Sequence, residues 1–258
     1  IYGSFEIYQR DTKDLLTTTR PAAGTNLTNN IPANIGTLEN KGFEVTLNIV
    51  PVRTAKAEWS LGVNMTRNRN EITSLTLGDD PNFQGFETGG ISGGVGNNIQ
   101  IHSVGFPTNS YYVYEQVYSE TGLPIEGLYV DRNGDGVISP NDRYRFENPA
   151  PDYFFGFTSN FNYKAFDFSF AGRANIGNFA YNNRFVNSTN YNSIVNSTGF
   201  LGNVHPQINS VGHNVPQYFS DFFLEDASFL RLDHITAGYR FTNVFGSDRG
   251  GNLRLYAT

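Results

Sequence analysis

Residues 57–66 read AEWSLGVNMT, and this stretch predicts the fold of the whole chain. Every second residue is apolar, and each residue between is polar or glycine. The apolar positions are Ala57, Trp59, Leu61, Val63 and Met65. Because successive side chains of a strand point to opposite faces, the pattern predicts a β-strand with one apolar face and one polar face.

The same alternation recurs along the chain. It is found in residues 1–10, 43–49, 153–162, 166–175, 234–241 and 252–258, and in 153–162 it fails at Phe154 and Ser159. The stretches that connect these strands are alternately short (51–56, 164–165, 242–251) and long (11–39, 68–152, 176–227). Short turns at one edge and long loops at the other are typical of a transmembrane β-barrel.

Composition excludes several other classes. The 258 residues include no Cys, so disulfide frameworks, thiolate metal sites and cysteine nucleophiles are excluded. A net charge of −6 argues against nucleic acid as a partner. Apolar runs are far shorter than the ~20 residues of a membrane-spanning helix. The 31 Asn and 27 Gly fit strands joined by turn-rich loops.

A soluble β-sandwich is the alternative, because its strands alternate as well. Strands of about ten residues and strongly aromatic faces favour the membrane barrel. Seven predicted strands are an odd number, and an open edge in lipid would leave backbone groups unpaired. The alternation also continues to both ends of the chain. We therefore expect residues 1–258 to be a portion of a larger barrel wall.

Four segments resemble the C-terminal part of SusC-like (SusC/RagA) TonB-linked outer-membrane transporters of Bacteroidetes. The segments are Glu39–Glu44 (ENKGFE), Asp131–Ile138 with Asp142 (DRNGDGVI…D), Asn148–Pro151 leading to Phe155–Phe157, Asn162–Lys164 and Phe166–Asp167, and Glu225–Leu232 (EDASFLRL) running on to Gly238–Tyr239. Each motif is weak alone. Together, in family order, they are fairly specific.

The resemblance implies an all-β fold, part of a large antiparallel transmembrane barrel of about 22 strands. Family members import glycans or peptides through a plugged barrel, with a SusD-like surface lipoprotein as lid and the TonB complex as energy source. The expected location is the outer membrane, with lipid against the aromatic faces. The plug domain and final strands would lie outside residues 1–258. Polar strand positions would line the lumen or touch the plug: Glu44, Thr46, Asn48, Ser60, Asn64, Asp167 and Arg173.

One segment has the spacing of a calcium loop. Asp131, Asn133, Asp135 and Asp142 would supply side-chain oxygens, Val137 a backbone carbonyl, and Gly136 the sharp turn. Asp142 stands where an EF-hand has Glu, which predicts weaker binding, and no helical pattern flanks the loop. The alternative is that these side chains form turns with their own backbone. Strand parity places this loop on the extracellular side.

The sequence does not predict an enzyme. The four His lack a partner motif, and the glycine-rich segment 89–94 lacks the lysine of a nucleotide loop, so no nucleotide or redox cofactor is expected. Loop aromatics could stack on sugars or peptides, or pack the loops together; they are Phe83, Phe86, Tyr111, Tyr112, Tyr114, Tyr181 and Tyr191. The preferred function is nutrient import. The alternative is a secreted, calcium-stabilised β-sandwich for binding or adhesion.

Overall fold

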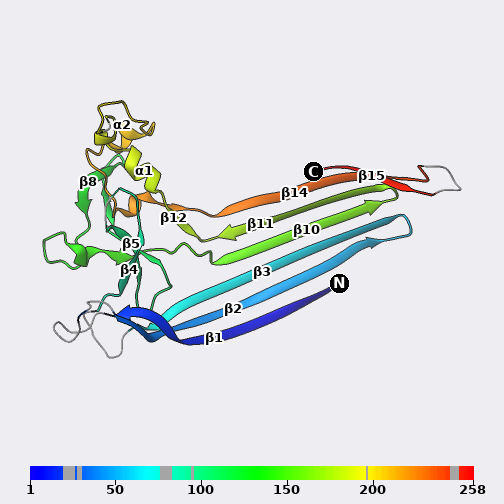
Figure 1. The fold of residues 1–258 in the computed structure, drawn as a ribbon, viewed down its shortest axis with the longest axis horizontal. Coiled ribbons are helices and arrows are strands. Elements are labelled where there is room, and N and C mark those ends of the chain that lie inside the picture. The colour runs from blue at the N-terminus through cyan, green and yellow to red at the C-terminus, as the bar shows by residue number, and fades with distance from the viewer. Residues whose placement is uncertain (20–26, 28–30, 76–82, 94–95, 196, 245–249) are drawn as a thin grey trace.

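The computed structural model describes residues 1–19, 27, 31–75, 83–93, 96–195, 197–244 and 250–258. The chain has two parts, a long antiparallel sheet and a smaller unit gathered at one end of it (Figure 1). We call the smaller part the loop unit, comprising the described residues of 83–152 and 177–228. Within the described residues, no helix is long and apolar enough to cross a membrane.

The sheet has seven strands in the order β1-β2-β3-β10-β11-β14-β15, each antiparallel to its neighbours. The strands are β1 (Tyr2–Thr19), β2 (Ile31–Arg53), β3 (Ala57–Ser74), β10 (Tyr153–Tyr163), β11 (Phe166–Ile176), β14 (Phe229–Thr242) and β15 (Asn252–Ala257). Each strand overlaps one of the stretches that alternate in the sequence. The prediction of seven strands is confirmed, and all seven lie in one sheet.

The register joins the apolar faces of the strands into one surface. Val63 of β3 pairs with Leu47 of β2 on one side and with Phe157 of β10 on the other. The same surface continues to both edge strands through the pairs Phe5 with Val45, Phe170 with Ile235, and Tyr239 with Leu255. The opposite face carries most of the polar positions, as the alternation predicts.

A β-bulge preserves this apolar face in β14. The register between β11 and β14 shifts between Ala171 and Gly172, which leaves Asp233 as an extra residue. Leu232 and Ile235 therefore point to the same face although they are three positions apart. Without the bulge, one of the two would turn to the polar face.

The two exceptions to the alternation in β10 have separate explanations. Ser159 lies on the apolar face but is almost fully buried, and its hydroxyl accepts the indole N–H of Trp59 at 3.0 Å. This hydrogen bond satisfies two polar groups at once. Phe154 pairs with Thr66 and so lies on the polar face, one residue from the loop end of β10.

Short turns close the end of the sheet that is farther from the loop unit (Figure 1). Between β2 and β3, the Thr54 amide donates to the Ala57 carbonyl at 2.7 Å and the Thr54 hydroxyl accepts the Ala57 amide at 2.9 Å. Between β10 and β11, Lys164 takes a φ of 53°. Both long connections that the structure describes lie at the other end, as strand parity predicts.

The loop unit is made of short elements. Its strands are β4 (Phe86–Gly90), β5 (Asn98–His102), β6 (Ser110–Val113), β7 (Gln116–Tyr118), β8 (Pro124–Tyr129), β9 (Tyr144–Arg145), β12 (Phe179–Tyr181) and β13 (Leu224–Asp226). Its helices are α1 (Asn183–Ser188), α2 (Ile208–Val211) and the 3₁₀ turns η1 (Pro140–Asp142), η2 (Tyr191–Ser193) and η3 (Asp221–Phe223). Two apolar clusters hold them together, one around Val113 and Leu224, the other around Val186 and Phe223.

The long connections between strands are shorter and more regular in the structure than the sequence predicts. β1, β2 and β3 run 18, 23 and 18 residues, well beyond the alternating stretches and into the predicted loops. At their loop ends both faces of these strands carry polar residues, so the one-sided pattern fades although the backbone stays paired. The loop unit was missed because each of its strands is only two to six residues long.

The β-sandwich alternative was wrong. A sandwich requires a second sheet packed over the apolar face. Across the part of the chain that the structure describes, that face is uncovered: Val63, Phe168 and Ile235 are 47%, 42% and 46% exposed. The small sheets are gathered at one end of the long sheet (Figure 1).

Candidate functional site

The polar face of the sheet carries the residues predicted to line a lumen. Asn64 pairs with Thr46 on one side and with Gly156 on the other, and Ser60 pairs with Asn160. The register places all seven predicted residues on this face: Glu44, Thr46, Asn48, Ser60, Asn64, Asp167 and Arg173. The face is thus a continuous polar surface across neighbouring strands.

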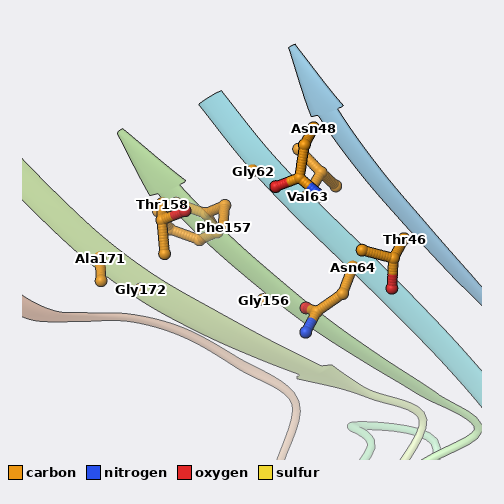
Figure 2. Close-up of a pocket in the computed structure, with 10 residues that line it drawn as sticks. All are labelled: Thr46, Asn48, Gly62, Val63, Asn64, Gly156, Phe157, Thr158, Ala171 and Gly172. Atoms are coloured by element: carbon orange, nitrogen blue, oxygen red, sulfur yellow. The ribbon is translucent and has the colours of Figure 1, made fainter. Parts of the chain in front are cut away.

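Glycines hollow this surface at its centre. Figure 2 shows the depression, of ≈ 210 Å³, where Thr46, Asn64 and Thr158 surround glycines of β3 and β10. A Cβ at Gly156 would come within 2.2 Å of Asn64 Oδ1, and one at Gly62 within 2.7 Å of Thr158 Oγ1. Glycine therefore allows these polar side chains to lie flat on the sheet. The result is a shallow depression rather than an enclosed pocket.

Two groups of charges bridge strands on this face. The Arg254 guanidinium of β15 donates from Nε and Nη2 to the two oxygens of Asp167 in β11, at 2.9 and 2.5 Å. A Cβ at Gly238, which lies between them in β14, would come within 2.7 Å of the Asp167 carboxylate. Nearer the loop end, Asp233 lies 3.6 Å from Arg173 Nε and 3.5 Å from Arg231 Nε.

The predicted calcium loop forms a compact series of turns. The two oxygens of Asp131 accept the amides of Gly134 and Gly136 at 2.7 and 2.8 Å, and Asn133 Oδ1 accepts the amide of Asp135 at 2.9 Å. Both glycines have positive φ, 73° and 82°. These are the side-chain-to-backbone turns that the sequence allows as the alternative to metal binding.

Asp142 closes the loop from its far end. It is fully buried, and its carboxylate accepts the amides of Ser139 at 2.8 Å, Arg132 at 3.0 Å and Asn133 at 3.3 Å. The Ser139 amide, followed by the other two, lowers the pKa of Asp142 below its usual range. Asp142 also forms a capping box with Ser139 at the start of η1.

Val137, the fifth predicted ligand, is 63% exposed, and its amide donates to Asp135 Oδ1 at 2.8 Å. Among the described residues, no three His, Cys, Asp or Glu side chains come together as a metal-binding group. A carboxylate or amide oxygen that accepts one N–H retains a second lone pair. Calcium binding by this loop stays a prediction.

A buried polar network that sequence reasoning missed lies inside the loop unit. Asp221 Oδ1 accepts the amide of Gln116 at 3.0 Å and Oδ2 accepts the Tyr144 hydroxyl at 2.8 Å, while the Ser220 hydroxyl donates to Gln116 Oε1 at 2.7 Å. Burial raises the pKa of Asp221, and burial together with the Asp221 bond raises the pKa of Tyr144. Gln116 and Asp221 are 105 positions apart, so no local pattern identifies them.

Most of the loop aromatics pack within the loop unit. Tyr111 and Tyr112 are 4% and 5% exposed, and the rings of Tyr114 and Tyr129 stack with centroids 4.7 Å apart. Burial raises the pKa of Tyr129 to about 12. For these residues the packing alternative holds. Tyr191 differs, since its side chain is 39% exposed at the surface of the unit.

No family model matches the chain. Curated relatives do match. The chain is 42% identical over 262 residues to the TonB-dependent receptor SusC of Bacteroides thetaiotaomicron, covering 100% of the chain and 26% of the relative. It is 29% identical over 276 residues to the TonB-dependent receptor P3 of Formosa agariphila, covering 99% and 27%. The chain thus spans about a quarter of the length of these relatives.

Solved structures share the fold. The structure of the RagAB peptide transporter superposes with a TM-score of 0.71 at 21% sequence identity, over 98% of this chain and 28% of that chain. The RagAB peptide importer in its "open-open" state gives a TM-score of 0.70 at 20% identity, with the same coverage. At this identity the match establishes the fold alone: a section of the wall of a large antiparallel barrel, together with its loops.

Proposed function

Because the chain is SusC-like along its whole length and corresponds to about a quarter of that TonB-dependent receptor, we propose that it forms wall and surface loops of an outer-membrane nutrient transporter. The import of nutrient oligomers, whether glycans or peptides, would be the function of the complete receptor. TonB would supply the energy from the periplasmic side.

The observation that carries the proposal is the apolar face of the sheet. It is continuous over seven strands, and the described part of the chain does not cover it. In water, such a surface would be an aggregation hazard. In a bilayer it is solvated by lipid, while backbone groups stay paired between strands. The 11 residues of β10 and β11 match the ~9–11 residues with which a tilted strand crosses the hydrocarbon.

The polar face would meet the lumen and the plug of the complete receptor. Its shallow centre around Gly62 and Gly156 suits close approach of a neighbouring backbone or a hydrated solute. Its charges are compensated across strands by the Asp167–Arg254 pair and the Asp233 group. A hydrophilic, charge-balanced surface is what passage of a polar oligomer requires, and catalysis has no role in the proposal.

The loop unit would lie on the extracellular side, beneath a SusD-like lipoprotein. The strand order supports the extracellular position, because the loop unit joins the strands at the end opposite the short turns (Figure 1). Support comes also from the RagAB structures, described as a peptide transporter, whose fold this chain shares. Exposed apolar side chains at Val195, Leu201 and Val215 would contribute to the contact with the lid.

Calcium is proposed as a stiffener of the loop at residues 131–142, with no part in chemistry. Its ligands would be Asp131, Asn133, Asp135, the Val137 carbonyl and Asp142. Titration calorimetry of calcium into the complete receptor should give heat that the Asp135→Ala variant loses. Identical heats from both proteins would contradict calcium binding by this loop, whose side chains would then serve only to form turns with the backbone.

The import proposal is tested in cells that depend on the complete receptor. Deleting the receptor should abolish growth on the oligomer it imports, and loss of TonB should have the same effect. Candidate glycans and peptides are supplied singly, and growth on the corresponding monomers is the control. Growth on every oligomer without either protein would contradict the proposal. A protein that remains soluble without detergent would contradict it independently.

A further inference from the structure

A row of cations borders the apolar face at its loop end. On this face, one row contains Ile7, Phe43, Arg67 and Tyr153 on β1, β2, β3 and β10. The next row toward the loop unit contains Gln9, Lys41 and Arg69. Three cations, Lys41, Arg67 and Arg69, therefore lie where the apolar surface of these strands ends.

The position of this row along the strands is well defined. Tyr153 is the first residue of β10, which has 11 residues, and its ring lies 5.5 Å beneath the Arg67 guanidinium. At the turn end of the same face stand aromatic residues, where Phe166 and Phe241 both contact the Tyr239 ring. Aromatic residues mark the two interfaces of a barrel wall. Arg67 therefore lies at the level of the lipid headgroups.

The cations surround a groove on the outward surface of β1, β2 and β3. The groove measures ≈ 470 Å³. Its apolar floor comes from Phe5, Ile7 and Phe43, with the Phe5 and Phe43 rings 6.3 Å apart. Lys41, Arg67 and Arg69 line its loop end. The groove is amphipathic along the direction in which a lipid molecule would lie.

The charges of the groove are only partly compensated by the protein. Lys41 forms an ion pair with Glu39, which also accepts a hydrogen bond from Gln9 at 2.9 Å. Within the described residues, Arg67 and Arg69 are exposed and form no ion pair. Two guanidinium groups with free donors at an interface are suited to a phosphate, which they can bind with paired hydrogen bonds.

The next row toward the loop unit is acidic. Asp11, Glu39 and Glu71 pair side by side on β1, β2 and β3, about 7 Å beyond the cations given the rise of two residues along a strand. These carboxylates repel an anion that lies farther from the membrane. The attractive position for a phosphate is therefore confined to the level of Arg67 and Arg69, next to the apolar floor.

We propose that this groove binds an outer-leaflet lipid whose headgroup bears phosphate, with the phosphate between Lys41, Arg67 and Arg69 and an acyl chain on Phe5 and Phe43. The inference rests on the proposed function, because the outer membrane supplies both the lipid and the orientation of the strand ends. It commits to the lipid as occupant. A free phosphate lacks the apolar part that the floor matches, and the cations match an anion rather than a second apolar surface.

The test uses the complete receptor in phosphatidylcholine nanodiscs and native mass spectrometry. Diphosphorylated lipid A and its enzymatically dephosphorylated form are the two probes. The wild type should retain the phosphorylated probe, and a Lys41→Gln, Arg67→Gln, Arg69→Gln triple variant should bind it at least about tenfold more weakly, from the attraction that each interfacial cation provides. A control triple variant, Lys13→Gln, Lys56→Gln and Lys164→Gln, removes equal charge elsewhere and should bind as the wild type does.

Equal retention of the two probes by the wild type would overturn the proposal, and so would equal loss in both triple variants. A receptor mass that doubles at the expense of bound lipid would identify a second copy as the occupant instead. If the first triple variant does not fold, the wild-type comparison of the two probes and the single Arg69→Gln variant decide. Uptake and membrane insertion are measured in parallel. A receptor that inserts and imports but ignores the phosphate refutes this inference alone, whereas one that does not insert refutes the proposed function.

Discussion

The sheet and the loop unit differ in where they place their apolar side chains. Of the 13 buried hydrophobic side chains among the described residues, 11 lie between Ile99 and Leu224, in the loop unit, and the other two are Ile72 and Leu75 at the loop end of β3 and just beyond it. Apart from Ile72, the strands of the long sheet hold none of them, although they are rich in Phe, Leu and Val. The loop unit is thus stabilised by its own core. The sheet instead leaves its apolar side chains for lipid to solvate.

The largest expected effect is in the core of the loop unit. Phe223 is fully buried and contacts Phe185, Phe222 and His213. Phe223→Ala should destabilise the loop unit by about 3–5 kcal/mol, the usual cost of removing a buried ring. Hydrogen exchange of the complete receptor should show the loop unit opening while the sheet stays protected. Equal loss of protection in the sheet would mean that the two parts unfold together, which would contradict a loop unit stabilised by its own core.

A charge on the lipid face should affect the sheet nearly as strongly. Val63 lies at the middle of the apolar face, between Leu47 and Phe157. Val63→Arg should cost about 2–4 kcal/mol at mid-bilayer. Urea unfolding of the complete receptor in lipid vesicles measures this cost. Asn64→Arg, one residue away on the polar face, is the matched control and should cost much less; equal costs would contradict the assignment of the two faces.

The buried Asp221 gives the loop unit a distinctive pH dependence. Its pKa is raised by burial, so the folded state holds the proton at pH values where the unfolded state has released it. Stability is therefore full below the ordinary carboxyl pKa of 3.8 and falls as the pH rises through the raised value. Asp142, with its lowered pKa, acts oppositely and loses its contribution as the pH falls.

Two variants separate these contributions. Asp221→Ala leaves the Gln116 amide and the Tyr144 hydroxyl without their acceptor and should cost about 1–3 kcal/mol. Asp221→Asn cannot ionise, so it should remove the fall in stability with rising pH. The measurement is hydrogen exchange of the loop unit, corrected for intrinsic rates, over acidic to neutral pH. An unchanged pH dependence in Asp221→Asn would show that another group titrates.

The two regions also differ in how far their sequence predicts them. In the sheet, one environment faces each side of a strand, so residues 57–66 alone predict a strand and which of its residues lie on each face. Even the bulge at Asp233 is visible as a change of phase between Leu232 and Ile235. In the loop unit, partners such as Ser220 and Gln116 are about a hundred positions apart, and short strands have no period to detect. The calcium motif also cannot be decided from sequence, because its spacing is compatible with metal binding and with side-chain-to-backbone turns.

The smallest effect is expected from the Asp167–Arg254 pair on the polar face, whose side chains are 22% and 36% exposed. If water fills the space next to this face, the pair should contribute about 0.2–1 kcal/mol and weaken with salt. A double-mutant cycle with Asp167→Asn and Arg254→Gln in the complete receptor measures it. The matched control is Arg53–Glu58, at 3.5 Å and 71% and 49% exposed, which should couple even less.

A coupling well above about 1 kcal/mol, unchanged by salt, would contradict the picture of a hydrated polar face at this level. It would mean that other protein covers Asp167 and excludes water, since only a drier environment strengthens the pair without screening. The polar face would then resemble the loop unit, with its charges buried against a plug. The two regions would then differ only at the apolar face of the sheet, where lipid rather than a protein core removes the apolar side chains from water.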